Sequence, residues 1–246
     1  MSGTTLRITT FNMHKGVGAF NSRQALHEQR ELIRRLHSDI VFLQEVGGGK
    51  LHQQHPDHNT QHEYLADGTW PQFAYGKNAI YTGGHHGNAI LSKFPITRWE
   101  NWDISAHPVE QRGMLHCEIA ISGWDQPLHC LCLHLGLFSR WRKRQLQAVL
   151  DHIETAIPKD APLIIAGDFN DWFLKAGRIL HDTHLKEVFQ HSAGRHAKSF
   201  PSLFPLFCLD RIYIRGFHIQ HSEIHHGRTA TKVSDHVALS ATLNRL

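Results

Sequence analysis

The hydrophobic positions of the chain follow two patterns, one typical of strands and one of amphipathic helices. Residues 5–11 and 128–135 alternate between apolar and polar side chains, which predicts half-buried strands. Residues 40–43 and 163–166 are unbroken apolar runs, which are typical of strands buried on both faces. Further strands are predicted over residues 88–92, 113–121, 209–214, 219–224 and 237–243.

Two segments have apolar residues at helical spacing. One follows a possible cap at Asn21 or Ser22, and the other covers 140–157 and ends before Pro158. Their apolar faces carry Ala25, Leu32, Ile33 and Leu36 in the first, and Leu146, Val149, Leu150 and Ile153 in the second. A short helix is expected around 174–190, with loops over 47–70 and 194–208. Because helices fall between strands and no linker or internal repeat interrupts them, residues 1–246 are predicted to form a single α/β domain.

Composition narrows the class of protein. Hydrophobic residues at 41% and charged residues at 20% exclude a disordered chain. The apolar runs are strand-sized, so no integral membrane segment is expected, and the first residues lack the pattern of a secretion signal. The four cysteines, at 117, 130, 132 and 208, form no CxxC pair and are expected to be thiols in a reducing compartment, the cytoplasm. A net charge of +4 is too small to indicate nucleic-acid binding, and the 23 histidines are scattered.

Polar residues that suit phosphoryl chemistry recur at the ends of the predicted strands. Ligand sites of α/β proteins gather at such ends. Carboxylates bind hard cations, a histidine beside a carboxylate activates water, and amides contact phosphate. Each of these residues, taken alone, could instead be a turn or capping residue with no catalytic role. The set consists of Asn12, Glu45, His134, Asp168, Asn170, Asp210, Asp235 and His236.

These positions lie in motifs that resemble one family in order and context. The motifs are Thr10-Phe11-Asn12, Leu43-Gln44-Glu45-Val46, Gly87-Asn88-Ala89-Ile90-Leu91-Ser92, Leu133-His134-Leu135, Gly167-Asp168-Phe169-Asn170, Leu209-Asp210-Arg211-Ile212 and Ser234-Asp235-His236. Together they resemble the endonuclease/exonuclease/phosphatase superfamily, over residues 6 to 243. The resemblance implies an α/β (α+β) fold: a four-layered α/β sandwich with two mostly antiparallel β-sheets packed between helices.

The resemblance also implies a role for each residue. Glu45 is the expected main ligand of Mg²⁺, which Mn²⁺ could replace, with Asn12 and Asp235 completing the metal site. The implied catalytic residues are His134, Asp168, Asn170, Asp210 and His236, with Asp210 orienting His236. Either Asp168 or His236 activates the water. Asn12, Lys15, Arg112 and Asn170 are the expected substrate contacts.

The context of His134 separates branches of the family. His134-Leu135 resembles the deoxyribonuclease, sphingomyelinase and inositol-phosphatase branches, whereas abasic-site endonucleases usually carry a tyrosine in an Asn-Gly-Tyr setting. A protonated His134 would suit binding of a phosphate oxygen or protonation of the leaving group. The run Asn12-Met13-His14-Lys15-Gly16 resembles a poorly characterised bacterial branch.

Two apolar loops and a histidine-rich segment leave alternatives open. Residues 172–174 and the apolar residues of 200–207 suit a lipid head group or a membrane surface, base stacking on nucleic acid, or simple packing at the edge of the sandwich. The histidines at 52, 55, 58 and 62 match no closed zinc pattern, which favours a solvated loop.

The sequence therefore predicts a Mg²⁺-dependent phosphodiesterase that works as a monomer by in-line attack of water on phosphorus. Its substrate is a phosphate ester: a lipid head group, another small diester, or nucleic acid. An endonuclease or exonuclease acting on DNA or RNA is one alternative. A catalytically silent binding protein of the same fold is an alternative of another class.

Overall fold

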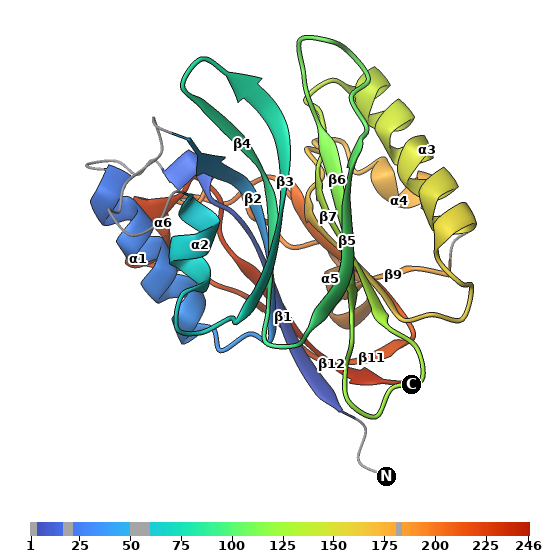
Figure 1. Cartoon of the computed structure of the whole chain (residues 1–246). Helices are drawn as coiled ribbons and strands as arrows, with labels where there is room; N and C mark the ends of the chain where they lie inside the picture. Colours follow the sequence, from blue (N-terminus) through green and yellow to red (C-terminus); the bar gives the residue numbers. More distant parts are fainter. Residues whose placement is uncertain (1–3, 17–21, 50–59, 181–183) are drawn as a thin grey trace.

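The strands form two six-stranded sheets, seen in the computed structural model, which describes residues 4–16, 22–49, 60–180 and 184–246 (Figure 1). The first sheet has the order β11-β12-β1-β2-β4-β3 and the second the order β5-β6-β7-β8-β10-β9. The strands of the first sheet are β1 (Thr5–Asn12), β2 (Ile40–Gly48), β3 (Gln72–Tyr81), β4 (Gly84–Ser92), β11 (Phe217–Ile224) and β12 (Leu239–Arg245). Those of the second are β5 (Ile96–Asp103), β6 (Gly113–Ile119), β7 (Leu128–His134), β8 (Leu163–Asp168), β9 (Lys186–Glu187) and β10 (Asp210–Arg215).

Strand direction follows the length of the connections. β1 pairs with β2, and β7 with β8, in parallel, and in each case a long helix crosses between the two strands. The other neighbouring pairs are antiparallel. The prediction of two mostly antiparallel sheets is confirmed.

Helices cover the outer face of each sheet, which gives four layers (Figure 1). α1 (Ser22–Arg35), α2 (Gln61–Ala66) and α6 (Arg228–Val233) pack on the first sheet, and α3 (Ser139–Ala156) and α4 (Ala176–Ile179) on the second. α5 (Val188–Ala193) contacts β10 and β11. The short turn η1 (His14–Gly16) follows β1. No helix among the described residues has both the length and the apolar character needed to cross a bilayer.

The main core lies between the sheets and contains a few polar cross-links. Side chains such as Ile8 and Phe42 from the first sheet meet Leu115 and Ile164 from the second, all fully buried. Asn88 of the resemblance motif donates from Nδ2 to the carbonyl oxygens of Gly113 (2.9 Å) and Cys132 (3.1 Å). Such buried amides fix how one sheet is placed on the other, because each would lose its partners if the sheets slid.

The structure corrects two of the predicted segments and adds two strands. β2 extends to Gly48 and α2 occupies part of the predicted 47–70 loop, while residues 50–59 lie outside the described residues. The predicted 174–190 helix is replaced by α4, β9 and α5. β3 and β5, which the sequence did not reveal, are edge strands whose faces are largely exposed, so they lack an apolar run.

Candidate active site

The candidate residues meet where three strands end. Asn12 closes β1, His134 closes β7 and Asp168 closes β8, and His134 and Asp168 are register partners. Because β7 and β8 are parallel, their carboxyl ends lie at the same edge of the second sheet. β1 contacts β8 across the sandwich, so the same edge of the first sheet faces this point. The strand-end residues therefore form one cluster.

Asp168 is the centre of this cluster and is almost completely buried. Its Oδ2 accepts a hydrogen bond from Asn12 Nδ2 (3.0 Å), and its Oδ1 accepts one from the backbone N–H of Asn170 (2.8 Å). Burial raises the pKa of Asp168 to about 6. The preceding Gly167 has φ +147°, and a Cβ there would lie 1.9 Å from the carbonyl oxygen of Leu133. Only glycine allows the chain to present Asp168 in this way.

His236 is held between carboxylates. Its Nδ1 donates to Asp210 Oδ2 at 2.7 Å, and its Nε2 lies 3.9 Å from Asp168 Oδ2. Burial alone favours the neutral ring, but the charge of Asp210 and its hydrogen bond, with Asp168 and Asp235, outweigh burial and raise the pKa of His236 to about 10. His236 is therefore an imidazolium at neutral pH.

The surroundings of His134, unlike those of His236, disfavour the charged form of the ring. Its Nε2 lies 3.6 Å from Asp168 Oδ2 and 4.0 Å from Glu45 Oε1. Burial, reinforced by the positive charges of Arg112 and His236, lowers the pKa of His134 well below its usual value. Burial therefore favours a neutral His134 ring, and the positive charges of Arg112 and His236 act in the same direction.

A bulge in β2 turns Glu45 toward the opening of the site. The register with β4 shifts between Leu43 and Val46, and Glu45 adopts φ +57°, which is rare for a residue with a side chain. Its carboxylate is 21% exposed and lines a cavity of about 300 Å³ together with Lys15, Arg112 and His134. The bulge thus makes an acidic group accessible from solvent beside buried catalytic candidates.

Two cations border that cavity. Lys15 lies in η1 with φ +57°, and Arg112 comes directly before β6. The guanidinium of Arg112 lies 3.5 Å from Glu110 Oε1, and its Nε is buried with no partner in the described structure. An anion in the cavity would therefore meet a pre-positioned donor.

Asp235 and Asn170 have partners that the sequence did not predict. Asp235 Oδ1 forms an ion pair with His14 Nδ1 at 2.8 Å. Although burial opposes it, this bond lowers the pKa of Asp235, and it raises that of His14. Asn170 donates from Nδ2 to the carbonyl oxygen of Leu135 (2.9 Å), so its amide positions the loop around Asp168. His14 lies within the Asn12-Met13-His14-Lys15-Gly16 run, and that run was its only signal.

Serine side chains fix the backbone around the cluster. Ser234 Oγ accepts from the N–H of His236 (3.1 Å) and donates to the carbonyl oxygen of Asn12 (2.7 Å). Ser199 Oγ accepts from the N–H of Asp210 (3.1 Å). These bonds tie three separate segments together and hold the acid–histidine pair in place.

The donor set suits a divalent cation at Glu45. Its carboxylate is a hard oxygen ligand beside a cavity, with only long contacts to Asn12 Nδ2 (3.4 Å) and His134 Nε2 (4.0 Å) in the described part of the chain. Asn12 presents its amide nitrogen to Glu45, while its oxygen accepts the N–H of His14. Oδ1 of Asp210 is buried without a partner among the described residues. Glu45 thus offers one carboxylate to the cavity, with the amide of Asn12 beside it. In the described part of the site, Asp168, Asp210 and His236 form a group whose ligand atoms all lie within 4.8 Å of one another and could also hold an ion.

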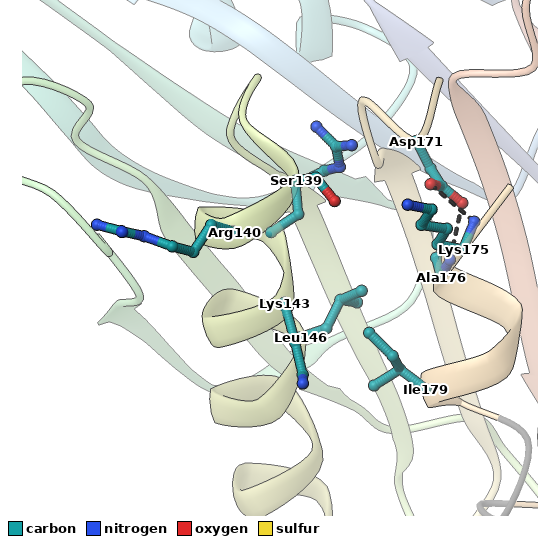
Figure 2. Close-up of a pocket in the computed structure, with 9 residues that line it drawn as sticks. Ser139, Arg140, Lys143, Leu146, Asp171, Lys175, Ala176 and Ile179 are labelled. Carbon is teal, nitrogen blue, oxygen red and sulfur yellow. Dashed lines mark hydrogen bonds between the residues drawn. The ribbon is translucent and has the colours of Figure 1, made fainter. Parts of the chain in front are cut away.

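A second cavity of about 390 Å³ lies between the start of α3 and α4 (Figure 2). Asp171 lines it, but its carboxylate accepts the backbone N–H groups of Lys175 (2.9 Å) and Ala176 (2.8 Å). Figure 2 shows Arg140 pointing away from this carboxylate. Asp171 therefore holds the turn after Asn170 and supports the site from outside.

Two groups of histidines lie away from the site. His62 is buried in α2 and stacks on Tyr75 at 4.4 Å, and burial lowers its pKa to about 4, so its expected place in a solvated loop is wrong. The histidines at 52, 55 and 58 lie outside the described residues. A second group packs under α3: His116 Nε2 lies 2.9 Å from His129 Nδ1, and His116 Nδ1 lies 3.0 Å from His152 Nε2.

Comparison with known families agrees with this geometry. The model of the endonuclease/exonuclease/phosphatase family matches residues 9–236, which is most of the chain. The chain belongs to this family. Members of the endonuclease/exonuclease/phosphatase family are hydrolases that act on phosphate esters, and the family includes metal-dependent phosphodiesterases and nucleases. The resemblance inferred from the strand-end motifs is confirmed.

Individual relatives support the family and the fold. YbhP of Escherichia coli strain K12, an uncharacterized protein, is 43% identical over 247 residues, which are 98% of this chain and 96% of YbhP. A functionally unknown conserved protein from Enterococcus faecalis V583 has a TM-score of 0.80 at 16% identity, covering 98% of this chain and 100% of that one. D. rerio TDP2, solved with a single-strand DNA product, has a TM-score of 0.74 at 19% identity, covering 98% and 99%. These structural matches establish the shared fold.

Proposed function

We propose that the protein is a Mg²⁺-dependent phosphodiesterase. The observation that carries this proposal is the environment of Asp168: a buried carboxylate with a pKa of about 6, oriented by Asn12 and Asn170, between a neutral His134 and a charged His236. A carboxylate whose pKa is near the working pH is suited to accept a proton from water. Membership of a family of phosphate-ester hydrolases supports the reaction class.

The charge states assign complementary tasks. Asp168 Oδ2 accepts a proton from the attacking water, whose oxygen bonds to phosphorus as the bond to the leaving oxygen breaks. The imidazolium of His236, oriented by Asp210, donates from Nε2 to a phosphate oxygen, where negative charge develops in the transition state. Lys15 and Arg112 draw the phosphate into the cavity. The leaving oxygen takes a proton from solvent water, so the products are a phosphomonoester and an alcohol.

A divalent ion held by Glu45 would neutralise a non-bridging phosphate oxygen. Neutral His134 lies within 4.0 Å of both Glu45 and Asp168, so it separates the two carboxylates and limits their repulsion. The division of labour between Asp168 and His236, which the sequence left open, is resolved in this proposal by charge: the neutral-pH base is Asp168.

Hydrolysis of bis-p-nitrophenyl phosphate beside p-nitrophenyl phosphate, with Mg²⁺, Mn²⁺ or EDTA, tests the proposal. We expect cleavage of the diester that EDTA abolishes. Asp168→Asn should lower kcat by about 10³-fold, and Glu45→Gln should raise the Mg²⁺ concentration needed for half-maximal rate. Asp151→Asn, on the exposed face of α3, is the matched control and should leave the rate unchanged.

Full activity of the Asp168→Asn protein, or equal activity in EDTA, would contradict the proposal. If the wild type cleaves neither ester and calorimetry detects no Mg²⁺ binding, the silent binding protein of the same fold becomes the better account. We also propose a reducing compartment, the cytoplasm, for this enzyme, because its four cysteines are all free and three of them are fully buried in strands.

A further inference from the structure

Two loops next to the catalytic cluster expose large apolar side chains. One loop follows Asn170 and Asp171, and the other comes before β10. In the first, Phe173 is 71% exposed; in the second, Leu203 is 83% and Phe204 is 70% exposed. Leu174, Leu206 and Phe207 are exposed as well. Packing at the edge of the sandwich, one of the alternatives left open by the sequence, does not account for these exposed residues. Exposure of so many large apolar groups in one place is uncommon on a monomer.

The two loops form one continuous surface, which we call the apolar rim (residues 172–174 and 200–207). The ring of Trp172 contacts those of Phe200 (5.7 Å between centroids) and Phe207 (4.9 Å). Leu174 and Phe204 line the same cavity, of about 590 Å³. The apolar side chains therefore act together, since a flat partner that touched one loop would touch the other.

The apolar rim is attached directly to the site. The ring of Phe200 lies 5.0 Å from that of His236. The N–H of Ser202 donates to the carbonyl oxygen of Asp235, and its Oγ donates to that of Ser234, both at 2.7 Å. A partner bound to the rim is thus held next to the segment that carries His236.

Further exposed apolar residues border the cavity at Glu45. Val109 is 79% exposed and lines this cavity with Glu45 and Arg112. Leu137, also exposed, donates its N–H to the carboxylate of Glu110, another residue of the cavity lining. Apolar groups therefore lie at the opening of the site as well as on the loops beside it.

Basic side chains lie beside the apolar rim. Arg195 and Lys198 are exposed and line the same cavity as Leu174 and Phe204. The Nζ of Lys175 lies 5.7 Å from the centre of the Phe173 ring. Apolar side chains that can enter the acyl region, next to basic side chains at the level of the head groups, are what binding to an anionic bilayer requires.

We propose that the apolar rim docks the protein on an anionic phospholipid membrane and brings a phospholipid head group to the site. The choice of a lipid surface over nucleic acid rests on the kind of side chain. Three of the six exposed residues are leucines, which have no flat ring on which a base could stack, and the net charge is only +4. The substrate half of this inference rests on the proposed phosphodiesterase; the docking half does not.

Co-sedimentation with lipid vesicles tests the docking surface. The wild-type protein should bind vesicles of phosphatidylcholine with phosphatidylglycerol, and bind those of phosphatidylcholine alone more weakly. The double variant Leu203→Ser/Phe204→Ser should lower the partition constant by about tenfold or more, since two apolar side chains no longer leave water. Arg195→Glu/Lys198→Glu should remove the preference for the anionic vesicles.

The control is Trp99→Ser, which removes a similarly exposed aromatic side chain from β5, away from the rim. It should bind as the wild type does. Each variant is also assayed on soluble bis-p-nitrophenyl phosphate, where the rate of the Leu203→Ser/Phe204→Ser protein should equal that of the wild type. An unchanged rate shows that the variant is folded.

Equal vesicle binding by the wild type and the Leu203→Ser/Phe204→Ser protein would overturn the inference. So would binding of single-stranded DNA, in a fluorescence anisotropy assay, by a protein that does not bind either vesicle. Vesicle binding without hydrolysis of any diester would refute the proposed function and leave the docking surface standing. Diester hydrolysis without vesicle binding would refute the docking surface and leave the proposed function standing.

Discussion

Two clusters of buried histidines differ in charge: one contains an imidazolium, His236, and the other is centred on a neutral ring, His116. His236 is bonded to Asp210 and lies near Asp168, and its pKa is raised to about 10. His116 is bonded instead to two other imidazoles, those of His129 and His152. Burial, assisted by its histidine neighbours, lowers the pKa of His116 to about 3.

The difference shows which surroundings keep a buried histidine protonated. Both rings are about equally hidden from solvent, so desolvation alone would make both neutral. The ring of His236 lies near two almost fully buried carboxylates, those of Asp210 and Asp168, whereas Glu118, beside His116 and His129, has a side chain that is 25% exposed. Burying charges such as those of Asp210 and Asp168 opposes folding. Neutral imidazoles that hydrogen-bond to one another let a helix pack on a sheet without charging these buried rings. A charged cluster is the arrangement expected of a site that stabilises a reacting anion.

Among the substitutions that separate the two clusters, the largest effect is expected from Asp210→Asn. Without the carboxylate, His236 loses its main source of positive charge and its orientation, so kcat for bis-p-nitrophenyl phosphate should fall by about 10²–10³-fold. The free energy of unfolding, measured with urea at pH 7, should fall as well, because the substitution removes one partner of a buried ion pair. A rate within threefold of the wild type would show that His236 does not need to be charged.

His116→Leu should lower stability without changing the rate. It leaves His129 Nδ1 and His152 Nε2 without their partner, so the free energy of unfolding should drop by about 1–3 kcal/mol. The rate at 25 °C should be that of the wild type. His218→Leu, at an exposed position of β11, is the matched control and should change neither quantity. Loss of activity in folded His116→Leu protein would contradict the division between the two clusters.

The two clusters also predict opposite pH dependences of stability. The folded pKa of His116 is below the unfolded value of about 6.5, so its contribution is complete above that pH and is lost on acidification. The free energy of unfolding falls by about 1.4 kcal/mol per pH unit for each proton that the unfolded state binds and the folded state does not. For His236 the folded pKa is raised, so its contribution is complete below pH 6.5 and is lost as the pH rises toward 10.

Urea denaturation at pH 5, 7 and 9 measures both slopes. His116→Leu should reduce the loss of stability between pH 7 and 5, and His236→Asn should reduce the loss between pH 7 and 9. Parallel pH profiles for the wild type and both variants would mean that neither histidine titrates as its surroundings require.

The smallest effect is expected from His14→Gln. The His14–Asp235 pair is close to half exposed, so its loss should cost at most about 1 kcal/mol of stability. Because the substitution frees the Asp235 carboxylate, Mg²⁺ affinity, measured by calorimetry, should stay equal or rise. A marked fall in affinity would instead show that His14 holds Asp235 in position for the metal.

The positions of the site residues could be predicted from the sequence, because polar residues after buried strands stand out from apolar runs. Asn12, His134 and Asp168 are such cases, and all three reach the cluster. Charge states could not be predicted, since they depend on neighbours from other segments, as His236 depends on Asp210. The edge strands β3 and β5 were missed because exposed strands need no apolar pattern.

NMR of ¹⁵N-labelled histidine rings in EDTA tests most directly whether buried carboxylates keep His236 charged. Assignment comes from the His236→Asn and His116→Leu proteins. At pH 8 the account predicts an imidazolium at His236, with both ring nitrogens protonated, and a neutral ring at His116. A neutral His236 ring at pH 8 would contradict it.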